Sequence, residues 1–337
     1  MPISLNSFIR NRGMAILFCL LVSTIILFAV SMFAGASAVG VGDLLHWLGG
    51  DADKRVSTIF WFVRLPRTLG CIVAGGSLAV AGLLLQTAMM NPLASPGIIG
   101  VNTGAGLFVV LAAALFPPLF WIRGVAAFAG GMAAVTVIWL LASRTGASRI
   151  TVILSGIAVS SILAAIIDAV VSLYPEVVMD KTEFYIGGFS SASMRQIFAV
   201  FPFVVTALLL SVLLASRFDL LTLGDEVAAS LGLNVLRTRF TAVLCAALLA
   251  ASAVSIAGLL GFIGLIVPNI VRKLTLSGMH FRLPVTLLFG ACLALLCDII
   301  SRVLFAPYEL SAGIPLSLIG APFFLWLILS RRKQRYD

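Results

Sequence analysis

One stretch of the chain limits its fold more than any other: from Thr68 to Ile122, 55 residues run without a single Asp, Glu, Lys or Arg. An uncharged run longer than about 18 residues is typical of a membrane-spanning helix. This run is long enough for two spans, and the prolines and glycine of the segment Asn91–Gly97 predict the break between them. With 61% hydrophobic and 10% charged residues, the whole chain is too apolar for a soluble domain.

Other apolar runs, each about 17–23 residues long, predict the remaining spans, at 14–33, 124–143, 151–173, 197–216, 240–260, 284–304 and 314–330. The run from Phe240 to Val271 is too long for one span and too short for two. We therefore predict a full span followed by a short broken helix at 266–275, which must lie against protein because unpaired backbone is not tolerated against lipid. The prediction is an all-α polytopic membrane protein with ten spans and a single transmembrane domain over residues 1–337.

The first span has features of a signal peptide, because Arg10 and Arg12 precede it and Ala36-Ser37-Ala38 resembles a cleavage site. Its apolar run of 20 residues exceeds the usual length of about 7–15, so we predict a retained span. Ten spans place both termini on one side. With that side cytoplasmic, fourteen of the 22 Lys and Arg fall in inside segments, as the positive-inside rule favours. The same scatter of basic residues argues against nucleic acid as the reason for the net charge of +9.

A short sequence recurs and indicates an inverted internal repeat. Ala81-Gly82-Leu83-Leu84 with Pro92 returns as Ala257-Gly258-Leu259-Leu260 with Pro268, at an offset of 176 residues. An odd number of spans separates the copies, so the halves would be inverted, as in many transporters. Chance matches are also common in sequence rich in Ala, Gly and Leu.

The sequence has few residues of the types that carry out catalysis. The only histidines are His46 and His280, and no lysine stands in the Gly-Lys-Ser/Thr context of a P-loop. We read the cysteines as small buried hydrophobes rather than metal ligands or disulfides, because none has a C-x-x-C spacing. They are Cys19, Cys71, Cys245, Cys292 and Cys297. We therefore predict no catalytic residue, no metal site and no cofactor.

Only Asp168 and Asp298 place a carboxylate inside predicted spans, where a charge is costly and usually functional. Asp298 has Arg302 four residues later, so a helix-end ion pair competes with a proton relay. Asp168 lies late in its span, and a role in a transport pathway is one interpretation. So few ionisable groups favour a transporter that takes its energy from a partner, with an ion-coupled secondary transporter of a small solute as the alternative.

The segment 217–239 predicts a site for such a partner on the cytoplasmic side. Asp225 and Glu226 follow Gly224 and begin a helical stretch, where negative charge suits the helix dipole, and Gly232 ends it. Apolar residues recur at helical spacing: Val227, Ala228, Leu231 and Val235. A helix on the lipid surface is the alternative, but low positive charge favours a protein groove.

Two cations in Arg64-Leu65-Pro66-Arg67 lie on the predicted outer side, where the positive-inside rule disfavours them. Docking of carboxylates on a soluble partner is one interpretation, and interfacial anchoring is the other.

The sequence resembles the FecCD-type permease family, the membrane subunits of ABC importers for ferric siderophores, haem and cobalamin, over about residues 55–330. The matching motifs occur in order along the chain. They are Arg64-Leu65-Pro66-Arg67-Thr68, Gly82-x3-Gln86, Asn91-Pro92-Leu93-Ala94-Ser95-Pro96-Gly97, Gly100-Val101-Asn102, Gly187-Gly188-Phe189, Gly224-Asp225-Glu226, Leu231-Gly232, Gly261-Phe262-Ile263-Gly264-Leu265-Ile266-Val267-Pro268, Asp298-x3-Arg302 and Gly320-Ala321-Pro322-Phe323.

The resemblance implies a type II ABC importer in the bacterial inner membrane. Its partners would be a second permease subunit, identical or homologous, two cytoplasmic ATP-binding subunits and a periplasmic solute-binding protein. It implies docking by Arg64, Arg67 and Arg302, and coupling to the ATPase through the residues from Gly224 to Gly232.

The resemblance also implies a translocation path lined chiefly by the span at 151–173, with help from the last span, and an inner gate near Arg144 to Thr151. The small and polar residues that fit such a path are also common at ordinary helix contacts. They are Ser155, Gly156, Ser160 and Ser161, with Asp168 further along. The chain departs from the family pattern at Met90, at Ser311-Ala312 and at Asn269, where the family often has His.

Overall fold

The protein is a bundle of helices, described here by a computed structural model. The structure describes residues 3–34, 49, 54–117, 119, 121–144, 146, 148–275, 278–304, 306 and 308–333, and no strand occurs among them. His46 and the segment Ala36-Ser37-Ala38 lie outside the described residues.

Each of the ten predicted spans corresponds to a helix, so the predicted fold class is confirmed. These helices are α1 Ile3–Phe33, α4 Leu65–Ala88, α5 Val101–Leu115, α6 Ile122–Arg144, α7 Arg149–Leu173, α9 Met194–Leu213, α12 Val235–Ala257, α13 Ile263–Leu274, α14 Met279–Val303 and α15 Gly313–Lys333. Seven of the described helices are long and apolar enough to cross a membrane. The chain is therefore a multi-pass membrane protein, and α13 is the short broken helix that the sequence predicts.

Shorter elements lie between the spans, and the sequence predicted only the one at Asp225. They are α3 Lys54–Ile59, η1 Phe60–Arg64, η2 Pro96–Ile99, η3 Pro175–Val177, α8 Val178–Ile186, α10 Ala215–Leu221 and α11 Asp225–Ser230. α3 and η1 run directly into α4 and lengthen it to a continuous helix over Val56–Ala88. The prolines of the break after α4 lie in the loop and at the start of η2, as expected for residues that cannot continue a helix.

Two helices form the centre of the bundle. In α4 and α12, 83% and 78% of the span is buried, against 17% in α1, 22% in α7 and 28% in α9. Small residues allow the close packing, because a Cβ at Gly82 would overlap the backbone of Gly264 in α13, and one at Gly75 would lie 2.6 Å from the carbonyl oxygen of Gly290 in α14. The lightly packed α1, α7 and α9 are left to face lipid or another subunit.

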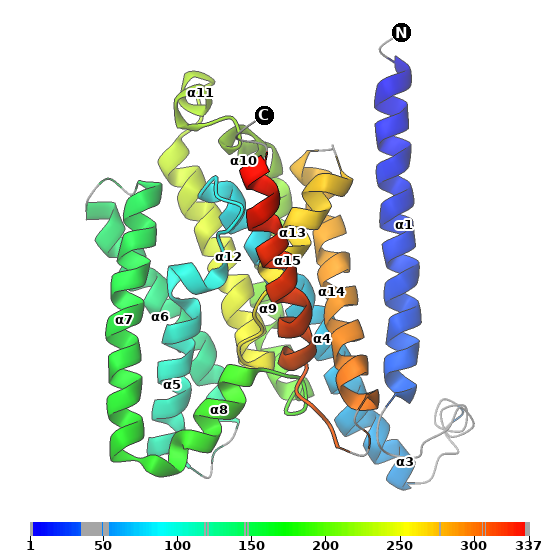
Figure 1. The fold of residues 1–337 in the computed structure, drawn as a ribbon, viewed down its shortest axis with the longest axis vertical. Helices are drawn as coiled ribbons and strands as arrows, with labels where there is room; N and C mark the ends of the chain where they lie inside the picture. Colours follow the sequence, from blue (N-terminus) through cyan, green and yellow to red (C-terminus); the bar gives the residue numbers. More distant parts are fainter. Residues whose placement is uncertain are drawn as a thin grey trace.

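The bundle has two distinct ends (Figure 1). α10 and α11 lie at one end, where α1 begins and α15 finishes, and we call it the α11 end. α3 and α8 lie at the opposite end, here the α8 end. α4 runs toward the α11 end and α12 runs away from it, as an inverted repeat requires. The two copies of Ala-Gly-Leu-Leu differ in local structure, however. The first copy lies within α4, whereas in the second copy Gly258 is the C-cap of α12 with φ of +64°.

Candidate functional site

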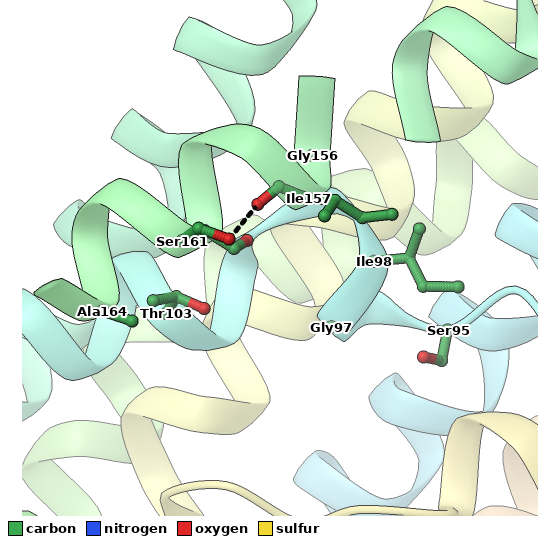
Figure 2. Close-up of a pocket in the computed structure, with 9 residues that line it drawn as sticks. Ser95, Gly97, Ile98, Thr103, Gly156, Ile157, Ser161 and Ala164 are labelled. Atoms are coloured by element: carbon green, nitrogen blue, oxygen red, sulfur yellow. Dashed lines mark hydrogen bonds between the residues drawn. The ribbon is translucent and has the colours of Figure 1, made fainter. Parts of the chain in front are cut away.

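A cavity of about 470 Å³ lies where α7 meets η2 and the start of α5. Its walls carry hydroxyl groups and small or apolar side chains, and charged residues are not among them. The lining residues are Ser95, Gly97, Ile98, Thr103, Gly156, Ile157, Ser160, Ser161 and Ala164, most of which Figure 2 labels. Such a surface offers weak hydrogen bonds over a wide area and no tight site, which suits passage better than retention.

Three of the predicted path residues line this cavity. Gly156 is buried, and a Cβ there would overlap the carbonyl oxygen of Ile98, so only glycine lets η2 lie this close to α7. The Ser161 hydroxyl donates to the Ile157 carbonyl at 3.0 Å (Figure 2). The Ser160 hydroxyl is buried and has no hydrogen-bond partner among the described residues.

The other two predicted path residues lie outside the cavity lining. Ser155 is half-buried on α7 just before Gly156. Asp168 is exposed and its Oδ1 accepts from Lys181 Nζ of α8 at 2.9 Å, so its charge is paired near the surface at the α8 end. Ser95, Gly97 and Thr103 of the lining were not singled out for the path, since nothing in the sequence showed that η2 folds back against α7.

The three arginines expected to dock a partner meet at a buried charge cluster at the α8 end. Arg67 Nε donates to Asp298 Oδ1 at 3.0 Å, and Arg302 Nη2 lies 2.8 Å from Asp298 Oδ2 in an ion pair without hydrogen-bond geometry. Arg64, Arg67 and Arg302 are each at most 5% exposed, and Asp298 is fully buried. We call these four residues the arginine cluster.

The arginine cluster also caps a helix. Arg302 donates to the carbonyl oxygens of Ser31 and Ala34 at 3.0 and 2.7 Å, and Arg64 donates to that of Met32 at 2.5 Å. These acceptors lie at the end of α1, where carbonyls lack intrahelical partners and the helix dipole favours cations. The cluster thus joins α1, α4 and α14, and the sequence predicted only the pairing of Asp298 with Arg302.

One contact links the arginine cluster to the surface. Arg67 Nη1 donates to Glu309 Oε2 at 2.6 Å, and the Glu309 side chain is 36% exposed. Glu309 lies on the lining of a second cavity, about 790 Å³ in volume, which also holds the ion pair of Arg123 with Asp180. Glu309 is thus a partly exposed partner of the buried Arg67.

The predicted helix at Asp225 is confirmed as α11. Gly224 and Gly232 bracket it with φ of +103° and +83°, a backbone that glycine adopts without strain. Of its expected apolar stripe, Ala228 is buried against the protein, whereas Val227 and Leu231 are exposed and Val235 is half-buried in α12. Leu223, 53% exposed, extends this apolar tip. Glu226 is exposed beside it.

Asp225 itself points back to the bundle. Its carboxylate accepts from Arg239 Nη2 of α12 at 2.7 Å on both oxygens and from Arg149 Nη2 of α7 at 2.5 Å. Partial burial raises the pKa of Asp225, but hydrogen bonds from Arg239 and Arg149 outweigh it, so the pKa lies below its ordinary value. We call these three residues the α11 junction. No pattern in the sequence predicts this junction, because Arg149 and Arg239 are 76 and 14 positions away from Asp225.

Asn269, one of the departures from the family pattern, makes two hydrogen bonds inside the protein. Its amide donates to the carbonyl oxygens of Leu265 and Pro92 at 2.8 and 2.9 Å, so it ties α13 to the loop after α4. One turn further along α13, Arg272 Nη2 donates to the Gln86 side chain of α4 at 2.8 Å and so joins α13 to α4.

Comparison with known proteins places the chain in a family. The model of the FecCD transport family matches residues 23–330. The Fe(3+)-citrate import system permease protein YfmD of Bacillus subtilis is 36% identical over 91% of this chain and 92% of its own length. The hemin transport system permease protein HmuU of Yersinia pestis is 35% identical over 94% of this chain and 96% of its own. A solved structure described as an inward-facing conformation of a metal-chelate type ABC transporter superposes with a TM-score of 0.81 at 27% identity, covering 94% and 99% of the two chains.

Proposed function

The chain belongs to the FecCD transport family, and on that premise we propose that it is the permease subunit of an ABC importer. Its substrate would be an iron(III)-siderophore or a related metal chelate, taken across the bacterial inner membrane. The relatives named for ferric citrate and hemin import support this class of cargo.

The observation that carries the proposal is the exposed apolar tip of Leu223, Val227 and Leu231 on α11. These three large apolar side chains, one within the six-residue helix and two beside its ends, are exposed outside the spans, and such a patch fits a groove on another protein. Because the sequence has no P-loop, the energy would come from two ATP-binding subunits that receive this tip. The chain itself would have no catalytic activity, and the α11 end would be cytoplasmic together with both termini.

A second permease subunit, identical or homologous, would complete the path. α7 exposes Leu154, Ile157 and Ile162 by 56–61% on a helix whose span is only 22% buried. Because the 470 Å³ cavity opens beside this face, a subunit packed there would close the remaining side of a channel. Ser160 and Ser161 would then lie on the route of the chelate.

We further propose that a soluble chelate-binding protein docks at the α8 end by its carboxylates. Arg67 would be the arginine it reaches first, because Glu309 already holds Arg67 as an incoming carboxylate would. Arg64 and Arg302 would hold the surface in place through the arginine cluster. Docking then requires Glu309 to give way, which the arrangement permits since Glu309 is partly exposed.

Reconstitution in proteoliposomes tests the proposal. The chain is incorporated with and without its ATP-binding and binding-protein partners, and uptake of radioactive iron is measured as ferric citrate, ferric enterobactin and haem. We expect uptake of at least one chelate only with partners and ATP. Uptake driven by a pH gradient without an ATPase would instead establish the alternative, an ion-coupled secondary transporter.

A further inference from the structure

The α11 junction connects three parts of the molecule through one carboxylate. Asp225 belongs to α11, Arg239 to the central helix α12, and Arg149 is the first residue of α7. Asp225 binds both arginines at once, since Oδ1 accepts from each of them.

The two arginines differ in how firmly they are held. The Arg239 side chain is 5% exposed, and its Nε also donates to the Ala88 carbonyl oxygen at the end of α4 at 3.2 Å, so it is fixed to the two central helices. The Arg149 side chain is 27% exposed and extends from a helix with little packing. A displacement of Asp225 would therefore move Arg149 more easily than Arg239.

A glycine stands at each end of α11. Gly224 and Gly232 both have positive φ, and a Cβ at either would meet nothing within 4 Å, so neither end of α11 is closely packed. The buried Ala228 and the ion pairs of Asp225 hold α11 against the bundle. Its neighbour Glu226 is exposed and has no ion pair among the described residues.

We propose that Asp225 is the positioning residue that transmits movement of α11 to α7, with Arg239 as the fixed point and Arg149 as the link to the helix that lines the path. This inference rests on the proposed function. When an ATP-binding subunit shifts the apolar tip, Asp225 pulls or releases the first turn of α7. The wall of the cavity at Gly156, Ser160 and Ser161 moves with that helix.

The first measurement needs no partner. Hydrogen–deuterium exchange is compared for the purified chain in lipid nanodiscs, as wild type, Asp225→Asn and Arg149→Gln, with Glu226→Gln as the matched control. Asp225→Asn keeps the shape and removes the charge. We expect faster exchange in residues 222–233 in both junction variants and at the start of α7 in particular, with no change in the control.

The second measurement uses the reconstituted complex and whichever of the three iron chelates the wild type accumulates. We expect Asp225→Asn to lower the chelate moved per ATP hydrolysed by about fivefold, the factor that corresponds to ~1 kcal/mol for a partly exposed ion pair, while ATP hydrolysis continues. The double variant Asp225→Asn with Arg149→Gln should be no worse than either single one, because both remove the same link. Asp225→Glu should recover part of the ratio.

The outcomes distinguish the inference about Asp225 from the proposed function of the chain. Wild-type exchange in Asp225→Asn would overturn the inference, whatever the chain transports. Faster exchange together with a wild-type ratio of transport to hydrolysis would also overturn it, since the junction would then only stabilise a loop. If the wild-type complex moves no chelate, the proposed function fails and the inference falls with it, although the exchange result still describes the junction.

Discussion

The arginine cluster and the α11 junction are built alike and differ in one respect. Each has a single aspartate shared by arginines from different helices: Asp298 with Arg67 and Arg302, and Asp225 with Arg149 and Arg239. The Asp298 side chain is fully buried, whereas that of Asp225 is 44% exposed. The same chemistry therefore serves two purposes according to its contact with water.

Burial decides what happens when such a contact breaks. A charge left unpaired away from water costs several kcal/mol, whereas an exposed one is resolvated and loses about 0–1 kcal/mol. The arginine cluster is accordingly a fixed joint that holds α1, α4 and α14 together. The α11 junction can open and close at low cost, as a moving part requires.

The largest effect that would test this comparison is expected from Asp298→Ala. It leaves Arg67 and Arg302 without their carboxylate inside the protein, so we expect a loss of about 3–5 kcal/mol of stability. Thermal unfolding in detergent, or a loss of monodisperse protein, measures it. Asp168→Ala is the matched control, because Asp168 also pairs with a cation but is 73% exposed, and we expect about 0–1 kcal/mol there. Equal effects of the two substitutions would contradict the distinction between buried and exposed ion pairs.

A smaller effect is expected at the contact between η2 and α7. Gly156→Ala would push the Ile98 backbone away and cost about 1–3 kcal/mol, as overpacking does. α7 carries Arg149 of the α11 junction and packs lightly against the bundle. We therefore expect transport in proteoliposomes to fall more than thermal stability. Gly97→Ala in the same cavity is the control, since its Cβ would meet its nearest neighbour at an ordinary 3.4 Å. Unchanged transport in Gly156→Ala would show that this cavity is not on the path.

Most of the fold could be predicted because hydrophobicity dictates it. Apolar runs predicted all ten spans, including the short helix α13, where glycines and Pro268 interrupt the run. The elements that were missed are short or polar, such as α8 and α10, and no periodicity distinguishes them from loops. The local difference between the two Ala-Gly-Leu-Leu copies was also hidden, because a helix C-cap at Gly258 depends on the backbone that follows it.

The site was predicted less completely because it depends on contacts between distant residues. Asp298 and Arg302 are four positions apart on one helix, so their pairing could be read directly. Arg67 is 231 positions from Asp298, and Arg149 is 76 positions from Asp225. Neither ion pair can be predicted from composition or spacing. The internal partners of the arginines therefore had to come from the structure.

Glu309→Gln sharpens the account of the α8 end. Removing the charge frees Arg67 Nη1 from its internal carboxylate, so a binding protein should associate more tightly, by about fivefold for an exposed ion pair worth ~1 kcal/mol. Binding to the chain in nanodiscs at two salt concentrations measures this effect. Glu183→Gln is the control, since Glu183 lines the same cavity without an ion pair among the described residues. Weaker binding in Glu309→Gln would mean that Glu309 supports docking rather than competing with it.

The smallest effect concerns pH at the α11 junction. The pKa of Asp225 is lower in the folded protein than its ordinary value, so the folded chain binds fewer protons there than the unfolded chain. The stabilisation is therefore present above the ordinary pKa and is lost only as pH falls through the lowered one. We expect hydrogen exchange of residues 222–233, corrected for its intrinsic pH dependence, to be the same at about pH 7 and about pH 5. A change in that range would mean that Arg149 and Arg239 do not hold Asp225 ionised.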